Sequence, residues 1–438
     1  MQNTALQKQF FQYALPSMLS QLLNSCFIIV DGFFIGQNLG DAGLAAINVA
    51  WPITALIQAI SLGIGVGGSV RMATAMGKHD MQQAQRARGN TLLLLVATVV
   101  VLGVSLTLAS PYLLPLMGAK DELYPMALEY TRVICLLSVG QIMSTGILPL
   151  LRSSGKTIHA MVLMIVGLLS NIFLDWFFIQ KLQWGLAGAA LATTAAQIFC
   201  AVLALPALLT QKQCPVVAAE FRPQGQMMKG ILHYGISPFG LSLSTSVILL
   251  ITNLRALEYG GTRGVAVYAV LSYVIGSVVP LVTGVGDGIQ PLLSYAKGAQ
   301  DWHSLARLRR WGLMLAVGIA TASGVGIMLL RYQLPLVFGA SQQATVEGAA
   351  AMWTLAIACP FMAVVRFCSS YFCAVGQPLF SGILAYGEPL VAQPLFLFSL
   401  PLFMELTGVW VAYPAAELLT AACGVWLLYR QLHQTANN

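Results

Sequence analysis

Residues 63–67 read GIGVG and residues 284–288 read GVGDG, so the second glycine-rich stretch stands 221 positions after the first. When the sequence is laid on itself with that shift, the agreement continues on both sides of these stretches. The matching pairs include Gly77 and Gly298, Asp80 and Asp301, Arg86 and Arg307, and Arg88 and Arg309. A shift of 220 aligns the last apolar stretch of each half, where Gln197 falls on Glu417. Self-similarity at a fixed spacing indicates repeated structural units, here two homologous halves.

The composition indicates a membrane protein. Of the 438 residues, 58% are hydrophobic and only 8% are charged, whereas a soluble domain carries about 25% charged residues. The net charge of +7 comes from lysines and arginines that stand between apolar blocks. They do not form the basic patch that a nucleic-acid partner requires. Most soluble enzymes and nucleic-acid-binding proteins are therefore excluded.

The apolar residues fall in blocks of about 20, which is the length of a helix that spans a bilayer. Helices are expected because a lipid-facing backbone must satisfy its own hydrogen bonds. The sequence predicts about twelve spans, at residues 12–35, 46–70, 91–112, 127–149, 158–179, 186–210, 234–257, 265–291, 312–334, 347–372, 379–403 and 409–429.

The repeat and the spans together predict an all-α membrane protein with two homologous six-helix lobes. The N-lobe is expected over residues 1–210 and the C-lobe over 233–438, joined by a connection at 211–232. Because six is even, both lobes have the same orientation, and a pseudo-two-fold axis along the membrane normal should relate them. This plan is typical of transporters that rock two lobes around a central site.

Basic residues favour the cytoplasmic side of short loops. Most of the 22 lysines and arginines fall on the side that holds both termini and the connection. We therefore expect a multi-pass protein of the plasma (inner) membrane with both termini in the cytoplasm. The first apolar block is longer than a signal-peptide core, so it is expected to remain as a span.

Ionisable residues inside spans are costly and mark functional sites. The candidates are Asp31, Asp175, Asp287, Arg366, Glu388 and Glu417. Asp31 shares a helical face with Asn24 and Ser20 by its spacing, and Asn171 lies one turn before Asp175. Two polar faces in one half predict a wet internal pocket. A structural alternative is that the two aspartates pair with a buried Arg or Lys, but the N-lobe spans lack a deep basic residue.

The second half repeats the polar face with different chemistry. Ser242, Ser246 and Asn253 have the spacing of Ser20, Asn24 and Asp31, so an amide replaces the carboxylate. The titratable site is therefore expected in the N-lobe alone. We assign Ser20, Asn24, Ser246 and Asn253 to the substrate cavity, and we leave the roles of Arg366, Glu388 and Glu417 open.

Three segments give the chain a specific resemblance: VDGFFIG at 30–36, NIFLD at 171–175 and GAALAT at 188–193. With the duplicated twelve-span plan, they resemble the multidrug and toxic compound extrusion (MATE) transporters, and most closely the bacterial DinF-like and MepA-like branch. The resemblance implies a cation-coupling site at Asp31, Asp175, Asn171, Thr193 and Tyr130, and a helix that bends at Pro16. The C-lobe acids of the NorM branch have no clear match, since Asn253 occupies the corresponding span, and Glu388 departs from the basic residue expected there.

The resemblance implies an antiporter, not an enzyme, that exports lipophilic organic cations. Two carboxylates in one poorly hydrated pocket cannot easily both be ionised, which favours the proton as coupling ion. Sodium is the alternative, because Asp31, Asp175, Asn171 and Thr193 offer oxygen ligands to a hard cation. No cofactor or resident metal is expected, and the protein should act as a monomer. A flippase of lipid-linked sugars from the same superfamily is the rival function. A membrane-embedded enzyme would need a nucleophile or metal cluster that the sequence lacks.

Overall fold

Helices account for all the regular secondary structure in the part of the chain that the computed structural model describes, residues 2–211, 214–337 and 342–436. No strand occurs in that part. Residues 212–213, within the predicted connection, lie outside the described residues. The all-helical prediction is confirmed.

In the first half, most spans are single long helices. Their bounds are α1 Gln2–Gly77, α2 Met81–Leu116, α3 Leu123–Leu136, α4 Ser138–Ser153, α5 Thr157–Asp175, the π-helix η1 Trp176–Lys181 and α6 Gly185–Leu209. A turn at Gly40 divides α1 into the first two spans, Thr4–Gly40 and Ala42–Gly77. The helices α3 and α4 meet at 54° and together form the predicted fourth span.

The second half repeats this plan after a 3₁₀ turn, η2 Ala218–Phe221. Its helices are α7 Gly225–Gly298, α8 Trp302–Leu329, α9 Gln333–Val337, α10 Gln342–Ala374, α11 Pro378–Gly387, the π-helix η3 Glu388–Ala392, α12 Gln393–Ser399 and α13 Pro401–Ala436. The predicted eleventh span, 379–403, covers most of the run formed by α11, η3 and α12 and extends into the start of α13. Within the described residues, ten helices are long and apolar enough to cross a membrane, or eleven with the bent pair α3 and α4.

The helices extend further than their apolar blocks. The predicted third span, 91–112, is the middle of α2, which starts ten residues earlier. The Asp80 side chain caps that start by accepting a hydrogen bond of 2.9 Å from the Gln83 amide, which satisfies one of the free N–H groups of the first turn. Hydropathy marks the apolar middle of a helix, whereas capping residues mark its end.

The duplication is visible in the backbone itself. Positive φ angles recur at repeat-related positions, with a shift of 221 or 220: Gly40 and Gly261, His79 and Gln300, Gly155 and Gly376, Gly185 and Glu405. Gly40 has φ 61° and ψ −156°, and Gly261 has φ 58° and ψ −154°. This region is essentially restricted to glycine. Both halves therefore use the same turn between their first two spans.

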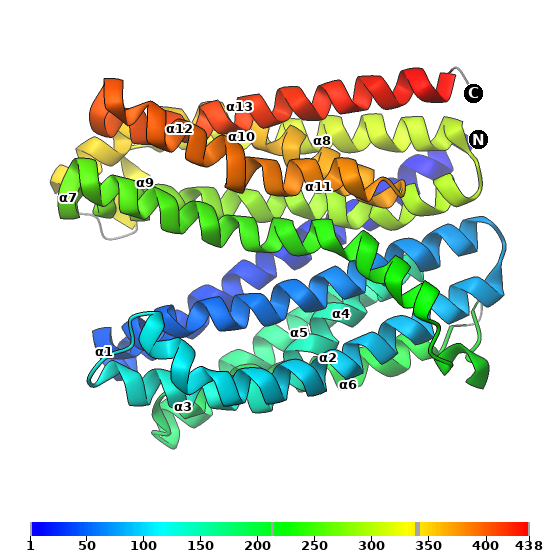
Figure 1. Ribbon diagram of the computed structural model, residues 1–438, viewed down its shortest axis with the longest axis horizontal. Coiled ribbons are helices and arrows are strands. Elements are labelled where there is room, and N and C mark those ends of the chain that lie inside the picture. The colour runs from blue at the N-terminus through cyan, green and yellow to red at the C-terminus, as the bar shows by residue number, and fades with distance from the viewer. Residues whose placement is uncertain (1, 212–213, 338–341, 437–438) are drawn as a thin grey trace. The chain divides into compact units, whose positions relative to one another are not determined.

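The chain forms two compact units. The first comprises Met1–Ser242 and Ser294–Asp301, and the second comprises Leu243–Leu293 and Trp302–Asn438. In the first unit, α2 and α4 pack together and α6 packs on α4 (Figure 1). The start of α7 also belongs to this unit, because the Gly63 and Gly235 backbones approach so closely that a Cβ on Gly63 would lie 2.8 Å from the Gly235 carbonyl oxygen.

The connection between the halves is fastened to the start of α2. Arg88 is fully buried and pairs with Glu220 of η2 at 2.6 Å. It also donates to the Cys214 carbonyl at 2.7 Å. The Asn90 amide oxygen accepts from the Gln224 backbone N–H at 2.8 Å. These contacts hold the described part of the connection against the start of α2, up to the start of α7.

Candidate functional site

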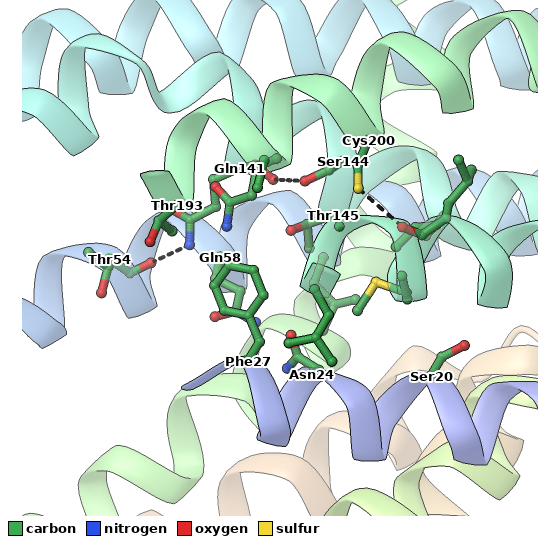
Figure 2. A pocket seen from close by; sticks show the side chains of 18 of the residues that line it. Ser20, Asn24, Phe27, Thr54, Gln58, Gln141, Ser144, Thr145, Thr193 and Cys200 are labelled. Atoms are coloured by element: carbon green, nitrogen blue, oxygen red, sulfur yellow. Dashed lines mark hydrogen bonds between the residues drawn. The ribbon is translucent and has the colours of Figure 1, made fainter. Parts of the chain in front are cut away.

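The first unit encloses a cavity of about 200 Å³ between α1, α3, α4, α5 and α6. A single water needs about 10–15 Å³ of such space, so the cavity has room for several water molecules or a small guest of similar volume. Its wall combines aromatic groups such as Phe27, Trp51 and Tyr130 with amides and hydroxyls. In Figure 2, Asn24 and Phe27 of α1 point into the cavity, toward the helices that carry Gln141 and Thr193.

Asp31 brings a carboxylate to this wall. Thr193 of α6 donates to its Oδ1 at 3.5 Å. Tyr130 of α3 is buried and interacts electrostatically with both Asp31 and Asp175. Three helices that are far apart in the sequence therefore converge on Asp31. The predicted residues Asp31, Thr193 and Tyr130 therefore lie near one another in the first unit.

Asp175 and Asn171 lie behind the cavity wall on α5. Both are fully buried. Asp175 interacts electrostatically with Asp31, and Asn171 lies beside it. Apart from the proximity of these two side chains to each other, neither has a hydrogen-bond partner of ordinary geometry within the described residues. The backbone changes from α- to π-helix directly after Asp175, a feature frequent at functional sites.

The carboxylate pair has no cationic partner among the described residues. Within the described part of the chain, no ion pair involves Asp31 or Asp175. Buried charges are normally paired, neutralised or bound to a cation. The pair can therefore hold a proton or a small cation beside the cavity. No group of three or more His, Cys, Asp or Glu suited to a metal occurs among the described residues.

The other predicted cavity residues divide between the two units. Ser20 and Asn24 line the cavity, and the Ser20 hydroxyl donates to the Pro16 carbonyl at 2.8 Å. Pro16 lies inside α1 without interrupting it. Ser246 and Asn253 lie half-buried on α7 in the second unit, and the described lining of this cavity does not include them.

The sequence reasoning missed a polar wall formed by the second half of α1 and by α4. Its members are Thr54, Gln58, Gln141, Ser144 and Thr145. The Gln141 amide donates to the Thr54 carbonyl at 3.3 Å, which ties the two helices together. The i, i+4 spacing of Thr54 and Gln58 and of Gln141 and Thr145 was a signal that could have found them.

Arg152 departs from the expectation that the N-lobe spans lack a deep basic residue. It lies in the last turn of α4, is buried and contributes to the cavity lining. The sequence places it beside polar residues, which favoured a cytoplasmic loop. In the structure α4 continues to Ser153 and carries Arg152 into the unit.

Two repeated halves of membrane-length helices, with a polar cavity inside one of them, define a polytopic membrane protein of the transporter class. The family model described as MatE matches residues 16–177 and 239–386. The chain belongs to the MatE family, which confirms the predicted resemblance.

Individual relatives cover almost the whole chain. The multidrug export protein MepA of Staphylococcus saprophyticus is 23% identical over 428 residues, which cover 96% of this chain and 93% of that protein. A MATE solved in complex with MaL6 is similar with a TM-score of 0.94 at 24% identity, over 99% of this chain and 98% of that one. A MOP superfamily transporter from Pyrococcus furiosus, with a TM-score of 0.91 at 25% identity over 97% and 96% of the two chains, is described as having a binding pocket of reverse polarity that suggests a different function.

Proposed function

We propose that the protein is a multidrug efflux antiporter that exports lipophilic organic cations in exchange for protons. The observation that carries this proposal is the Asp31 carboxylate on the cavity wall. It contacts Thr193, interacts electrostatically with Asp175 and forms no ion pair among the described residues. An organic cation in the cavity can neutralise this charge, while Phe27, Trp51 and Tyr130 offer ring faces to it. The relative MepA is named as a multidrug exporter, which agrees with this substrate class.

Exchange follows from competition for the same carboxylates. A proton on the Asp31 and Asp175 pair removes the negative charge that holds the organic cation, so proton binding favours its release. Pro16 lacks a backbone N–H, which makes the first span easier to bend at that point. A bend there would reshape the wall that carries Ser20, Asn24 and Asp31. Alternating access would expose the pair to each side in turn.

The coupling ion is tested in proteoliposomes with the purified protein and a cationic dye such as ethidium. We expect a proton gradient without sodium to drive dye transport, and a sodium gradient at equal pH to drive none. Transport driven by sodium alone would overturn the proton assignment. It would instead favour Na⁺ at Asp31, Asp175 and Asn171, whose oxygen atoms suit a hard cation.

One observation favours the rival function of flipping lipid-linked sugars. Arg152 contributes a buried guanidinium to the cavity lining, and arginine binds phosphate groups well. The two proposed functions predict different effects of Arg152→Gln on activity. A cation exporter should keep its dye transport in this variant, whereas a flippase should lose its activity toward a pyrophosphate-linked lipid.

We further propose that the protein lies in the plasma (inner) membrane with both termini and the connection in the cytoplasm, and acts as a monomer. Single cysteines at Gln7, Val216 and His433, all exposed positions, would report this orientation in a cysteine-free background. An impermeant maleimide added to intact cells should label none of them, and should label all three after lysis. Labelling from outside at any one of them contradicts the orientation.

A further inference from the structure

The second unit contains a buried charged cluster that the proposed transport site does not use. Arg366 of α10 is 5% exposed, and Glu388 of η3 and Glu417 of α13 are fully buried. An Arg366 Nη atom lies 3.7 Å from a Glu388 carboxylate oxygen. Its other Nη donates to the Ser244 hydroxyl of α7 at 3.3 Å. Three helical segments and α7 therefore meet around one guanidinium.

Glu417 is the unusual member of this cluster. It lies close enough to interact electrostatically with both Glu388 and Arg366. Both of its carboxylate oxygens are inaccessible to solvent and lack a hydrogen bond of ordinary geometry within the described residues. The side chains nearest to them are those of Glu388 and Tyr413. Burying such a carboxylate in its ionised form is costly unless its charge is compensated. A second acid is therefore buried beside the Arg366 and Glu388 ion pair, in which the two charges already balance.

If both acids were ionised, the charges of the cluster would not sum to zero. The titratable groups that interact electrostatically with Glu417 are Glu388, Arg366, Tyr413 and Cys359. Tyr413 and Cys359 are neutral in their ordinary protonation states at neutral pH. One guanidinium then faces two carboxyl groups, which leaves one negative charge uncompensated if both acids are ionised. One bound proton makes the buried cluster neutral.

We propose that Glu388 and Glu417 together form a second proton-binding site, which holds one proton beside Arg366. The proton neutralises one of the two carboxyl groups, and the other faces Arg366 as a carboxylate. Arg366 balances the remaining carboxylate and fixes the occupancy at one proton. Glu388 and Glu417 bind this proton whether or not the protein exports drugs, so a failed transport assay leaves the site standing.

The test counts protonated carboxyl groups by infrared spectroscopy on the purified full-length protein in lipid nanodiscs at neutral pH. The readout is the C=O stretch of a protonated carboxyl group, taken as a difference between wild type and variant. We expect Glu417→Gln to lose one such group, since the remaining Glu388 then pairs with Arg366 as a carboxylate. Glu388→Gln should lose one as well. Glu129→Gln, at an exposed position on α3, is the matched control and should change nothing.

Removing the guanidinium should have the opposite effect. Without Arg366 both acids must be neutral, so Arg366→Gln should gain one protonated carboxyl group. The double variant Arg366→Gln/Glu417→Gln should have one protonated carboxyl group from the pair, as the wild type does. This keeps the count informative even if one single variant does not fold. Asp31→Asn should leave all these differences unchanged, because that residue belongs to the other unit.

Two results would overturn the proposal. If Glu388→Gln and Glu417→Gln leave the protonated carboxyl signal unchanged, both acids are ionised in the wild type. If the wild-type signal from this pair is present only when sodium and potassium are omitted, an alkali cation and not a proton is the ligand.

Discussion

The two halves share one ancestral plan but place their buried acids in different surroundings. In the first half, Asp31 lies at a cavity among hydroxyl groups and a second carboxylate. In the second, Glu388 and Glu417 lie around Arg366. The repeat shifts of 221 and 220 relate Arg366, Glu388 and Glu417 to Thr145, Gly167 and Gln197, and all three of these line the first-half cavity.

This correspondence indicates how duplicated positions acquired different uses. The same three positions face the interior of each half. In the first half they hold small or neutral residues, which leaves room for a guest molecule. In the second they hold Glu388, Glu417 and Arg366, whose long side chains fill the space and whose opposite charges attract one another. We therefore expect the first half to bind the transported molecule and the coupling proton, and the second to hold a separate proton beside Arg366.

The most severe test of this division is removal of the first-half acids. Asp31→Asn and Asp175→Asn are nearly isosteric and remove a charge that is costly to bury, so folding should be preserved. We expect each variant to reduce proton-driven dye efflux to the level of empty liposomes. The measurement is the initial rate of dye transport at equal protein density, with membrane insertion checked by size-exclusion chromatography.

The matched control is Asp287→Asn, in the second half. Asp287 lies in the glycine-rich stretch 284–288 and is half-buried. We expect this variant to keep most of its efflux. Efflux retained in both first-half variants, or lost equally in the control, would contradict the assignment of coupling to the first half.

A second comparison concerns the arginines that the repeat pairs at positions 88 and 309. Arg88 is fully buried in an ion pair with Glu220, whereas Arg309 is half-buried and lies over the Tyr371 ring at 5.8 Å. Breaking a buried pair from one side costs about 3–5 kcal/mol. Losing a cation–π contact costs about 0.5–1 kcal/mol at an exposed site. Arg88→Met should therefore lower the thermal stability much more than Arg309→Met.

Thermal unfolding in detergent, followed by tryptophan fluorescence, measures both variants. The double variant Arg88→Met/Glu220→Leu should recover part of the lost stability, because it no longer leaves an unpaired buried carboxylate. Equal effects at positions 88 and 309 would mean that the connection is not held by this ion pair.

The fold was largely predictable from the sequence, because hydropathy and the repeat depend on many residues at once. The individual helix ends were less predictable, since α2 starts at a cap formed by Asp80, far outside its apolar block. The acids of the site could be found because a charge in an apolar block is conspicuous. Gln141 and Arg152 were missed because neutral amides, and basic residues near loops, give no comparable contrast.

The pairing of Arg366 with Glu388 could not be predicted from the sequence either. The two residues are 22 positions apart on separate helices, and no spacing rule within one helix relates them. Only the packing of η3 and α10 brings them to 3.7 Å. The sequence could identify each residue as buried and costly, but it could not identify the partner.

The smallest expected effect concerns the turn before the last span. The repeat relates Gly185, with φ 57°, to Glu405, with φ 48° and ψ −132°. A side chain in this left-handed region carries backbone strain that glycine does not, of about 1–3 kcal/mol. Glu405 is exposed, so its side chain contributes little packing. Glu405→Gly should therefore stabilise the protein by about 1 kcal/mol, and the reciprocal change Gly185→Ala should destabilise it.

A Cβ at Gly185 would meet no atom within 4 Å, so any loss of stability in Gly185→Ala reports backbone strain and not a clash. The measurement is the shift in unfolding temperature of the two variants in the same detergent. A drop in stability in Glu405→Gly would mean that the two halves do not share this turn geometry.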